Sequence, residues 1–508
     1  RIRDGDGVDP FLRSAAVSAL ARGAGDADAK ATLVEHAADP SADVRMAVLL
    51  TLRKLDDPTV ARFLDDVAPA IVLEAARCIV ERPGMDEALA KLAALADRRN
   101  LPEPLWRRIL TACEGPGAWS DPKALAAVAT RRDVPAAIRV EAVEMLARSA
   151  EPPPLPPLTG LHRGESKRPA DPAVAAFAPA LPTLVADPSD KVREAAASAA
   201  AALKLADAGP ALRGLVADAS RPAASRIEAL RALDALKDVR LAEVVDAAMK
   251  DDSVAVRAEG LKLLARLDPA RAIGAATRAL ASGSIPEKQA AFAAVGSIPG
   301  PEADALLASW LERLKAGEVP PEVRLDLAEA AAGRDSAEVK AALARYEATR
   351  DPNDPLAPYR DALAGGDAER GRRIFREKAE VQCLRCHKVA GDGGEVGPEL
   401  AGVGRRKDRA YVLESIVFPN KQIAEGFETQ VLALADGRVV AGIVKGEDDK
   451  EVRLVTPEGA LVVVPKEDVD EKTRGNSAMP EDLIKDLRKS EIRDLVEFLM
   501  STEPVAGR

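Results

Sequence analysis

A short phrase that recurs along the first two-thirds of this 508-residue chain constrains its fold most strongly. Each copy begins with Asp, passes through a turn that contains Pro or Ser, and continues through Val or Ile and Arg into an Ala- and Leu-rich stretch. Four copies have the Arg six residues after the Asp: Asp39 and Arg45, Asp133 and Arg139, Asp187 and Arg193, and Asp251 and Arg257. Weaker copies are centred on Arg13, Arg226 and Arg324, and three of the intervals between successive copies are 31, 32 and 33 residues.

Each copy is a unit that cannot bury its apolar face alone. The Asp and the Pro or Ser end one helix and provide an acceptor for the unpaired N–H groups that begin the next. Apolar residues then recur at helical spacing, and stacking of neighbouring units buries the resulting stripe. The repeated Asp and Arg can pair between neighbouring turns as a ladder. The pattern therefore predicts a mainly α fold with an α-solenoid, and its turn Asp and second-helix Arg resemble HEAT repeats; an irregular helical bundle is the alternative.

The proline-rich segment between Ala150 and Asp171 divides this predicted array. Its prolines favour an extended polyproline conformation and cannot continue a helix. We expect a first block of repeats over 1–150, a linker over 151–171 and a second block over 172–350. A ligand for proline-binding modules is the alternative for the linker. Cys78 and Cys113 lie in apolar helical stretches and are expected to be buried thiols, so the array has the character of a scaffold.

The charge of the chain argues against nucleic acid as a partner, and its hydropathy argues against a membrane span. The chain has 72 basic and 82 acidic residues and a formal net charge of −10. This balance argues against nucleic acid as a partner, because a surface that binds a phosphate backbone needs clustered positive charge. No uncharged apolar run reaches the roughly 18 residues of a membrane span. The chain starts at Arg1 without Met or a signal peptide, so we expect a processed chain or a piece of a longer one.

The sequence Cys383-Leu384-Arg385-Cys386-His387 carries the chemistry. C-x-x-C-H is the attachment signature of c-type haem. Two thiols three residues apart on one turn can each bond a vinyl group of the porphyrin, and the following imidazole can reach the iron. A thioredoxin-like pair would give no role to His387. A structural zinc site would need further Cys or His downstream, and the sequence has none after residue 387.

The residues that follow resemble class I cytochromes c. In that family the proline of a segment such as Val396–Leu400 offers its carbonyl to the proximal imidazole, which assigns this role to Pro398. The sixth iron ligand should be a thioether or an imidazole, and only Met479 and Met500 remain downstream. Met479 precedes Pro480 in a loop, whereas Met500 is in an amphipathic helix and is typical of a core residue. We therefore predict His387 and Met479 as the axial ligands, a pair that suits electron transfer.

The interval between His387 and Met479 is too long for a minimal cytochrome of this class. Strand-like segments fill it, with turns at Asp436-Gly437 and Glu458-Gly459, and predict a small barrel-like β insertion over about 427–470. The final helix should pack Leu495, Phe498 and Leu499 against an entry helix around Phe375. The whole predicted domain covers 362–508.

This order of motifs resembles the haem-binding domain family of planctomycetes and verrucomicrobia, a variant of class I c-type cytochromes. The resemblance covers about residues 365–502 and rests on the entry helix, CLRCH, GPEL, SIVFPNKQI, the GF…DGRVVAG insertion, SAMP and the closing helix. In that family the domain often follows HEAT repeats and, before them, a β-propeller that resembles sugar dehydrogenases. The resemblance implies an exported, periplasmic protein that accepts electrons from a dehydrogenase.

The resulting hypothesis is a one-electron carrier with one covalent haem c and a helical array that docks a redox partner, such as a sugar-type dehydrogenase. No residue of this chain is assigned a catalytic role. A haem sensor or peroxidase-like enzyme is one alternative, although no distal His or Arg is clearly placed to cleave peroxide. A binding scaffold in which the haem is structural is another.

Overall fold

The computed structural model describes residues 10–24, 27–82, 84–115, 120–162 and 167–504. The chain divides after Val256 into two compact units. Within the described residues no helix is both long and apolar enough to cross a membrane.

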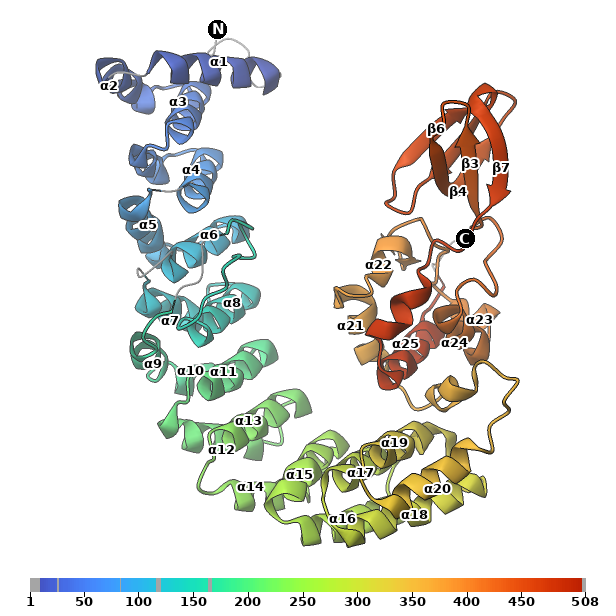
Figure 1. Ribbon diagram of the computed structural model, residues 1–508. Coiled ribbons are helices and arrows are strands. Elements are labelled where there is room, and N and C mark those ends of the chain that lie inside the picture. Colours follow the sequence, from blue (N-terminus) through green and yellow to red (C-terminus); the bar gives the residue numbers. More distant parts are fainter. Residues whose placement is uncertain (1–9, 25–26, 83, 116–119, 163–166, 505–508) are drawn as a thin grey trace. The chain divides into compact units, whose positions relative to one another are not determined.

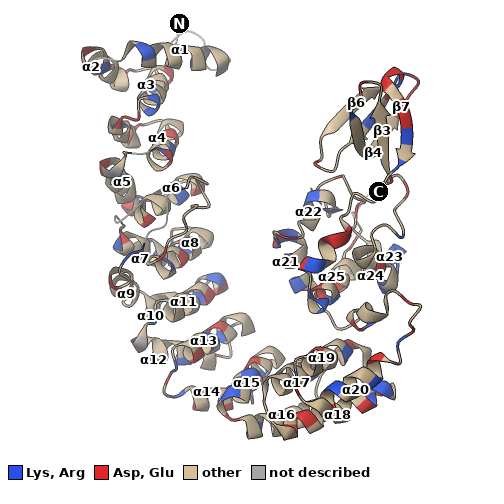
Figure 2. Cartoon of the chain, viewed as in Figure 1, with Lys and Arg blue, Asp and Glu red and all other residues tan. Residues whose placement is uncertain are grey.

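The first unit consists of short helices that follow one another along the chain (Figure 1). They are α1 (Pro10–Gly23), α2 (Ala27–Glu35), α3 (Ala42–Lys54), α4 (Pro69–Glu81), α5 (Asp86–Ala93), α6 (Glu103–Glu114), α7 (Pro122–Thr130), α8 (Ala136–Ala147), α9 (Asp171–Phe177), α10 (Leu181–Val185), α11 (Asp190–Ala202), α12 (Gly209–Ala217), α13 (Ala223–Ala235) and α14 (Leu241–Ala248). Helix α15 (Val254–Leu267) spans the division between the units. Basic and acidic side chains are interspersed along these helices (Figure 2).

The repeated Asp caps its own turn, and the repeated Arg ties copies together. The carboxylates of Asp39, Asp187 and Asp251 each accept a hydrogen bond from the backbone N–H two residues later, at 2.9, 2.8 and 2.9 Å. Arg139 donates to Asp187 in a later copy (Nη2–Oδ1 3.2 Å), and Arg226 pairs with Asp251 in the same manner. These two pairs are rungs of the ladder that the sequence predicts.

Arg45 departs from that ladder. It donates to both carboxylate oxygens of Asp66, at 2.7 and 2.9 Å, and its Nη1 donates to the backbone carbonyl of Asp39 at 2.8 Å. The Asp39 carboxylate is already engaged by the N–H of Ser41. The repeat therefore uses its Arg in two ways: within a copy to a backbone carbonyl, or across the array to a carboxylate.

The proline-rich segment does not interrupt the packing of the array. Helices α8 and α11, on either side of it, pack against each other. The Arg139–Asp187 pair that joins these two sides is almost fully buried, with side chains 7% and 2% exposed. Cys78 and Cys113 are both fully buried free thiols, as the sequence predicts.

The second unit continues with five paired helices and then changes character (Figure 1). The paired helices are α16 (Pro269–Ser282), α17 (Ile285–Ser297), α18 (Pro301–Lys315), α19 (Pro321–Ala332) and α20 (Ala337–Glu347). After them come α21 (Ala368–Glu377), the single turn α22 (Cys383–Cys386), α23 (Val403–Arg406), α24 (Arg409–Val417) and α25 (Lys489–Ser501). A short hairpin follows α22, and its two strands, β1 (Lys388–Val389) and β2 (Asp392–Gly393), have two residues each.

A five-stranded antiparallel sheet is inserted between α24 and α25. Its strands are β3 (Thr429–Leu434), β4 (Val439–Glu447), β5 (Glu451–Val455), β6 (Leu461–Pro465) and β7 (Val469–Arg474), in the spatial order β6-β5-β4-β3-β7. Leu432, Val452, Leu454 and Val464 form a small core of their own. The predicted insertion is confirmed, but its sheet is open, with β6 and β7 as its two edges, because these strands do not pair and close a barrel.

The closing helix α25 joins the last part of the chain to the paired helices before it. It packs on α21 through Phe498 and Phe375, whose ring centroids are 5.5 Å apart, as the sequence predicts. On α25, Arg493 donates to Asp326 of α19 at 2.7 Å, and both side chains are largely buried. The α19 residue Leu325 belongs to the same hydrophobic cluster as Phe375. Helix α19 and the last part of the chain therefore share one core.

Candidate functional site

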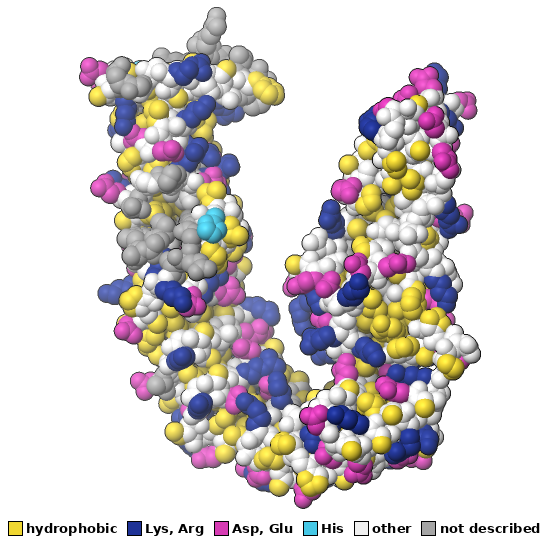
Figure 3. Space-filling view, viewed as in Figure 1, with side chains coloured by type: hydrophobic (Ala, Val, Ile, Leu, Met, Phe, Trp, Pro, Cys, Tyr) yellow, Lys and Arg dark blue, Asp and Glu magenta, His cyan; other side chains and the backbone are white. Residues whose placement is uncertain are grey.

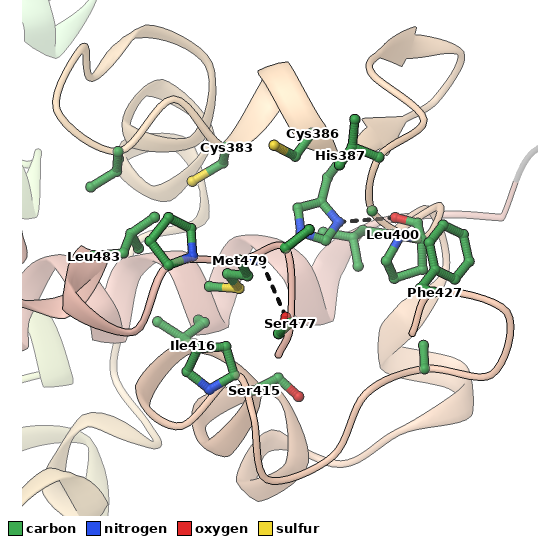
Figure 4. A pocket seen from close by; sticks show the side chains of 18 of the residues that line it. Cys383, Cys386, His387, Leu400, Ser415, Ile416, Phe427, Ser477, Met479 and Leu483 are labelled. Atoms are coloured by element: carbon green, nitrogen blue, oxygen red, sulfur yellow. Dashed lines mark hydrogen bonds between the residues drawn. The ribbon is translucent and has the colours of Figure 1, made fainter. Parts of the chain in front are cut away.

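A cavity of about 670 Å³ lies in the last part of the second unit. This volume is in the range of sites that hold organic ligands. Its walls come from the α22 turn, the 396–400 segment, α24, the residues on both sides of the β insertion, and α25. Three side-chain types that the sequence singles out, thiol, imidazole and thioether, line this one cavity (Figure 4).

The two cysteines of the C-x-x-C-H motif are the ends of α22. Gln382, just before them, has a left-handed backbone (φ 43°), and the chain leaves the turn at His387 in an extended conformation. Spaced one turn apart, Cys383 and Cys386 present both sulfur atoms to the cavity (Figure 4). Both are half-buried free thiols. Burial raises the pKa of Cys383 to about 11 and also raises the pKa of Cys386, against the charge of Arg385, so both carry their protons at neutral pH.

His387 is held from behind by its own chain. Its Nδ1–H donates to the backbone carbonyl of Pro398 at 3.0 Å, which leaves the lone pair on Nε2 for the cavity. The 397 position is a glycine against the imidazole, and a β-carbon there would lie only 2.5 Å from the ring atom Cε1. Burial lowers the pKa of His387 and the bond to Pro398 opposes that shift. The ring is therefore a neutral, oriented base.

Met479 lies on the cavity in a loop between β7 and α25. Its N–H donates to the Ser477 hydroxyl at 3.2 Å, and the Ser477 N–H donates to the side-chain carbonyl of Asn420 at 2.7 Å. These bonds tie the Met479 loop to the segment after α24. The thioether lies in the same cavity as His387 (Figure 4). Met500, the alternative, packs against the hydrophobic cluster and does not line the cavity.

The structure thus brings together all five residues that the sequence singles out: Cys383, Cys386, His387, Pro398 and Met479. It also adds residues that the sequence reasoning missed. From α24, Tyr411, Ser415 and Ile416 face the cavity, as the helical spacing of residues 411, 412, 415 and 416 could have indicated. From the β insertion, Phe427, Pro457 and Glu458 reach it, and no local pattern signals this contact.

The chemistry of these donors fits a covalently bound haem. Two adjacent thiols can be alkylated by the same planar group, and an imidazole with its outer nitrogen fixed by a carbonyl is oriented to bind a metal. A thioether is the soft neutral ligand that completes such a metal's coordination. Among the described residues, no group of three or more His, Cys, Asp and Glu side chains is arranged to hold a metal ion without such a group.

Comparison with known proteins gives two family matches. HEAT repeats match residues 6–69, and cytochrome c matches residues 368–441. A cytochrome c-553-like protein of Synechocystis sp. is 34% identical over 83 residues, which cover 16% of this chain and 73% of that protein. The chain belongs to the cytochrome c family.

Two further relatives match the same family over shorter stretches. The cytochrome c of Arabidopsis thaliana is 36% identical over 63 residues, 12% of this chain and 53% of the relative. That of Cochliobolus lunatus is 38% identical over 58 residues, 11% of this chain and 50% of the relative. The chain spans about half the length of these two cytochromes. The cytochrome c domain, taken here from α21 to α25, implies haem binding and electron transfer, and the HEAT repeats are characteristic of a scaffold for protein interaction.

Proposed function

We propose that this protein is an electron carrier with one haem c, attached through Cys383 and Cys386 and ligated by His387 and Met479. The observation that carries the proposal is the convergence of two thiols, a carbonyl-oriented imidazole and a thioether on one cavity of about 670 Å³. The sequence contains a single C-x-x-C-H motif, which supports one haem. When bound, the haem supplies a metal centre that gains and loses one electron reversibly.

The residues of this chain have separate tasks in the proposed site. Cys383 and Cys386 would each hold the haem by adding S–H across one vinyl double bond, with sulfur on one carbon and the proton on the other, so that no net oxidation occurs. The Pro398 carbonyl keeps the His387 ring oriented and its Nε2 basic. The bonds from Ser477 to Asn420 and from Met479 to Ser477 hold the thioether in position. The apolar walls from α24 and α25 exclude water.

The wider setting is also part of the proposal. Covalent haem attachment takes place outside the cytoplasm, and the resemblance to exported haem domains supports a periplasmic location. The HEAT repeats would bind a redox partner, for which a sugar-type dehydrogenase is the proposed electron donor.

The test is a redox titration of the matured full chain, followed by visible absorption. We expect a covalently bound haem, a reversible one-electron couple, and reduction by a partner dehydrogenase during its turnover. A haem sensor or a peroxidase-like enzyme predicts instead that carbon monoxide or peroxide reacts readily with the resting protein. A protein that keeps its partner function after loss of the haem would be a scaffold, and either result would overturn electron transfer as the function.

A further inference from the structure

The β insertion reaches the mouth of the haem cavity. The turn between β5 and β6 spans Thr456–Ala460, and its tip residues Pro457 and Glu458 line the cavity although both are solvent-exposed. Because Pro457 and Glu458 are both solvent-exposed and part of the cavity wall, they lie at the opening of the cavity. Phe427, immediately before the sheet, lines the same cavity and lies under the ammonium group of Lys445 from β4. The ribbon shows the β6 hairpin extending toward α22 (Figure 1).

This turn is held in a defined shape. The N–H of Thr456 donates to the carbonyl of Ala460 at 2.9 Å, and the N–H of Gly459 donates to the carbonyl of Thr456 at 2.8 Å. Gly459 has φ +87°, a left-handed conformation that favours glycine. Behind the turn, Val452 and Leu454 of β5 are buried in the core of the sheet. The tip therefore projects from a rigid hairpin.

The tip places a negative charge at the edge of the cavity that carries the thiols. The Glu458 side chain is solvent-exposed, so it is a carboxylate at neutral pH. Arg385 lies between the two cysteines of the motif, on the α22 turn. Arg385, the two cysteines and the tip line the same cavity, and the hairpin that carries the tip extends toward the α22 turn (Figure 1).

We propose that the Pro457–Glu458 tip screens the thiol edge of the haem cavity and selects redox reactants by size and charge. This inference rests on the proposed electron-transfer function. Electron transfer weakens steeply with distance, so a backbone turn over this edge holds bulky reactants further from the metal. The Glu458 carboxylate adds a local repulsion for anions and an attraction for cations. Hydrophobic side chains exposed on the sheet beside charged ones are visible in Figure 3, and a partner meeting this edge would also meet the insertion.

The charge part is tested with Glu458→Gln in the matured full chain. Stopped-flow oxidation of the reduced protein is measured with ferricyanide, an anion, and with a cationic cobalt(III) complex, each accepting one electron. We expect the ratio of the anion rate to the cation rate to rise several-fold at low ionic strength and to return to the wild-type value near 1 M salt, where screening is nearly complete. The matched control is Glu471→Gln on β7, at the opposite edge of the sheet. A Glu458→Gln ratio no different from that of the control would overturn the proposal.

The steric part is tested by replacing residues 456–460 with Asn-Gly, which closes the same hairpin without the projecting tip. We expect both reagents to react several-fold faster while haem staining and the visible spectrum stay unchanged. Unchanged rates in a matured variant would overturn the screen, and if this variant fails to mature, the Glu458→Gln result decides alone. The proposed function fails if the wild-type protein shows no reversible couple. The inference alone fails if that couple is present but the variants behave as wild type.

Discussion

The four cysteines of this protein belong to two regions that treat the same side chain differently. In the helical array, Cys78 and Cys113 are fully buried among apolar residues, and burial raises the pKa of each to about 12. In the cytochrome c domain, Cys383 and Cys386 are half-buried on the wall of a large cavity. Exposure to a cavity of suitable size, rather than residue type, therefore distinguishes the thiols that pack in a core from the thiols proposed to attach haem.

The polar groups of the two regions differ in the same way. Buried Arg and Asp side chains of the array, such as Arg139 and Asp187, form ion pairs with each other. In the cytochrome c domain, the bonds of Pro398 and Ser477 orient His387 and Met479 toward the cavity. In the array, hydrogen bonds join one repeat to another, whereas in the other region they orient side chains toward a cavity.

The strongest test of this contrast is removal of the two thiols that we propose attach the haem. Cys383→Ser combined with Cys386→Ser should abolish covalent haem completely, because the hydroxyl is a much weaker nucleophile toward a vinyl group. Haem staining on a denaturing gel measures this. The control Cys78→Ala should keep full staining, since that thiol only packs against its neighbours. Covalent haem in the double variant would show that the cavity thiols are not special.

The next largest effect is expected at the thioether. Met479→Ala should lower the reduction potential by on the order of 0.1 V or more, because axial ligands set haem potentials over a range of about 0.8 V and Met raises the potential. The absorption band of the sulfur–iron bond should disappear as well. Met500→Leu, a change of similar volume in the core, should leave both unchanged. If Met479→Ala keeps the wild-type spectrum, another group occupies the sixth position.

A third test removes one buried ion pair of the array and leaves the cavity residues unchanged. Asp187→Asn leaves the Arg139 guanidinium buried without its counter-charge, which should destabilise the first unit by about 3–5 kcal/mol. Urea denaturation followed by circular dichroism gives this value, and the haem spectrum should not change. The exposed pair of Arg240 and Glu243 provides the control, where Glu243→Gln should leave the urea midpoint almost unchanged because solvent screens this pair. Equal effects at the two sites would mean that burial adds nothing to the ladder.

The smallest expected effect is on the pH dependence of folding stability, and it involves the carboxylate of Glu287. The hydroxyl and N–H of Ser284, with Arg257, lower the pKa of Glu287 to about 2. An unfolded Glu titrates near pH ~4.3, so the stabilisation from this carboxylate is complete above that pH and is lost as the pH falls toward 2. After allowance for solvent screening it amounts to about 1–2 kcal/mol.

Glu287→Gln should remove this dependence. Urea denaturation of the helical part at pH 7 and pH 3 should show a smaller difference in stability for the variant than for the wild type. Glu338→Gln, at an exposed position at the start of α20, serves as the control and should leave the pH difference as it is. An unchanged pH difference in Glu287→Gln would show that its bonds to Ser284 and Arg257 carry no net stability.

Local patterns predicted the parts of this molecule that depend on neighbours in sequence. The Asp–Arg phrase predicted the helical repeats, and C-x-x-C-H predicted the thiols and imidazole on one cavity wall. Met479 was favoured over Met500 because Pro480 holds it outside a helix, and the structure places it on the cavity. The roles assigned to these residues in binding haem remain predictions.

What the sequence missed depends on contacts between distant segments. Glu458 and Arg385 line the same cavity although they lie more than 70 positions apart in the sequence, and no periodicity encodes this arrangement. The open edges of the sheet also depend on strand twist and register rather than on the identity of turn residues. Arg45 pairs with Asp66, a residue outside the recurring phrase, and this choice of partner is visible only in three dimensions.

The glycine at position 397 has an entropic consequence. With the imidazole of His387 confined between that glycine and the Pro398 carbonyl, the rotational freedom of this side chain is lost when the chain folds, before any cofactor arrives. Immobilising a free side chain on binding would otherwise cost about 0.5–1.5 kcal/mol. In the proposed site, haem would meet an imidazole that already points in one direction, and any larger residue at 397 would displace that ring.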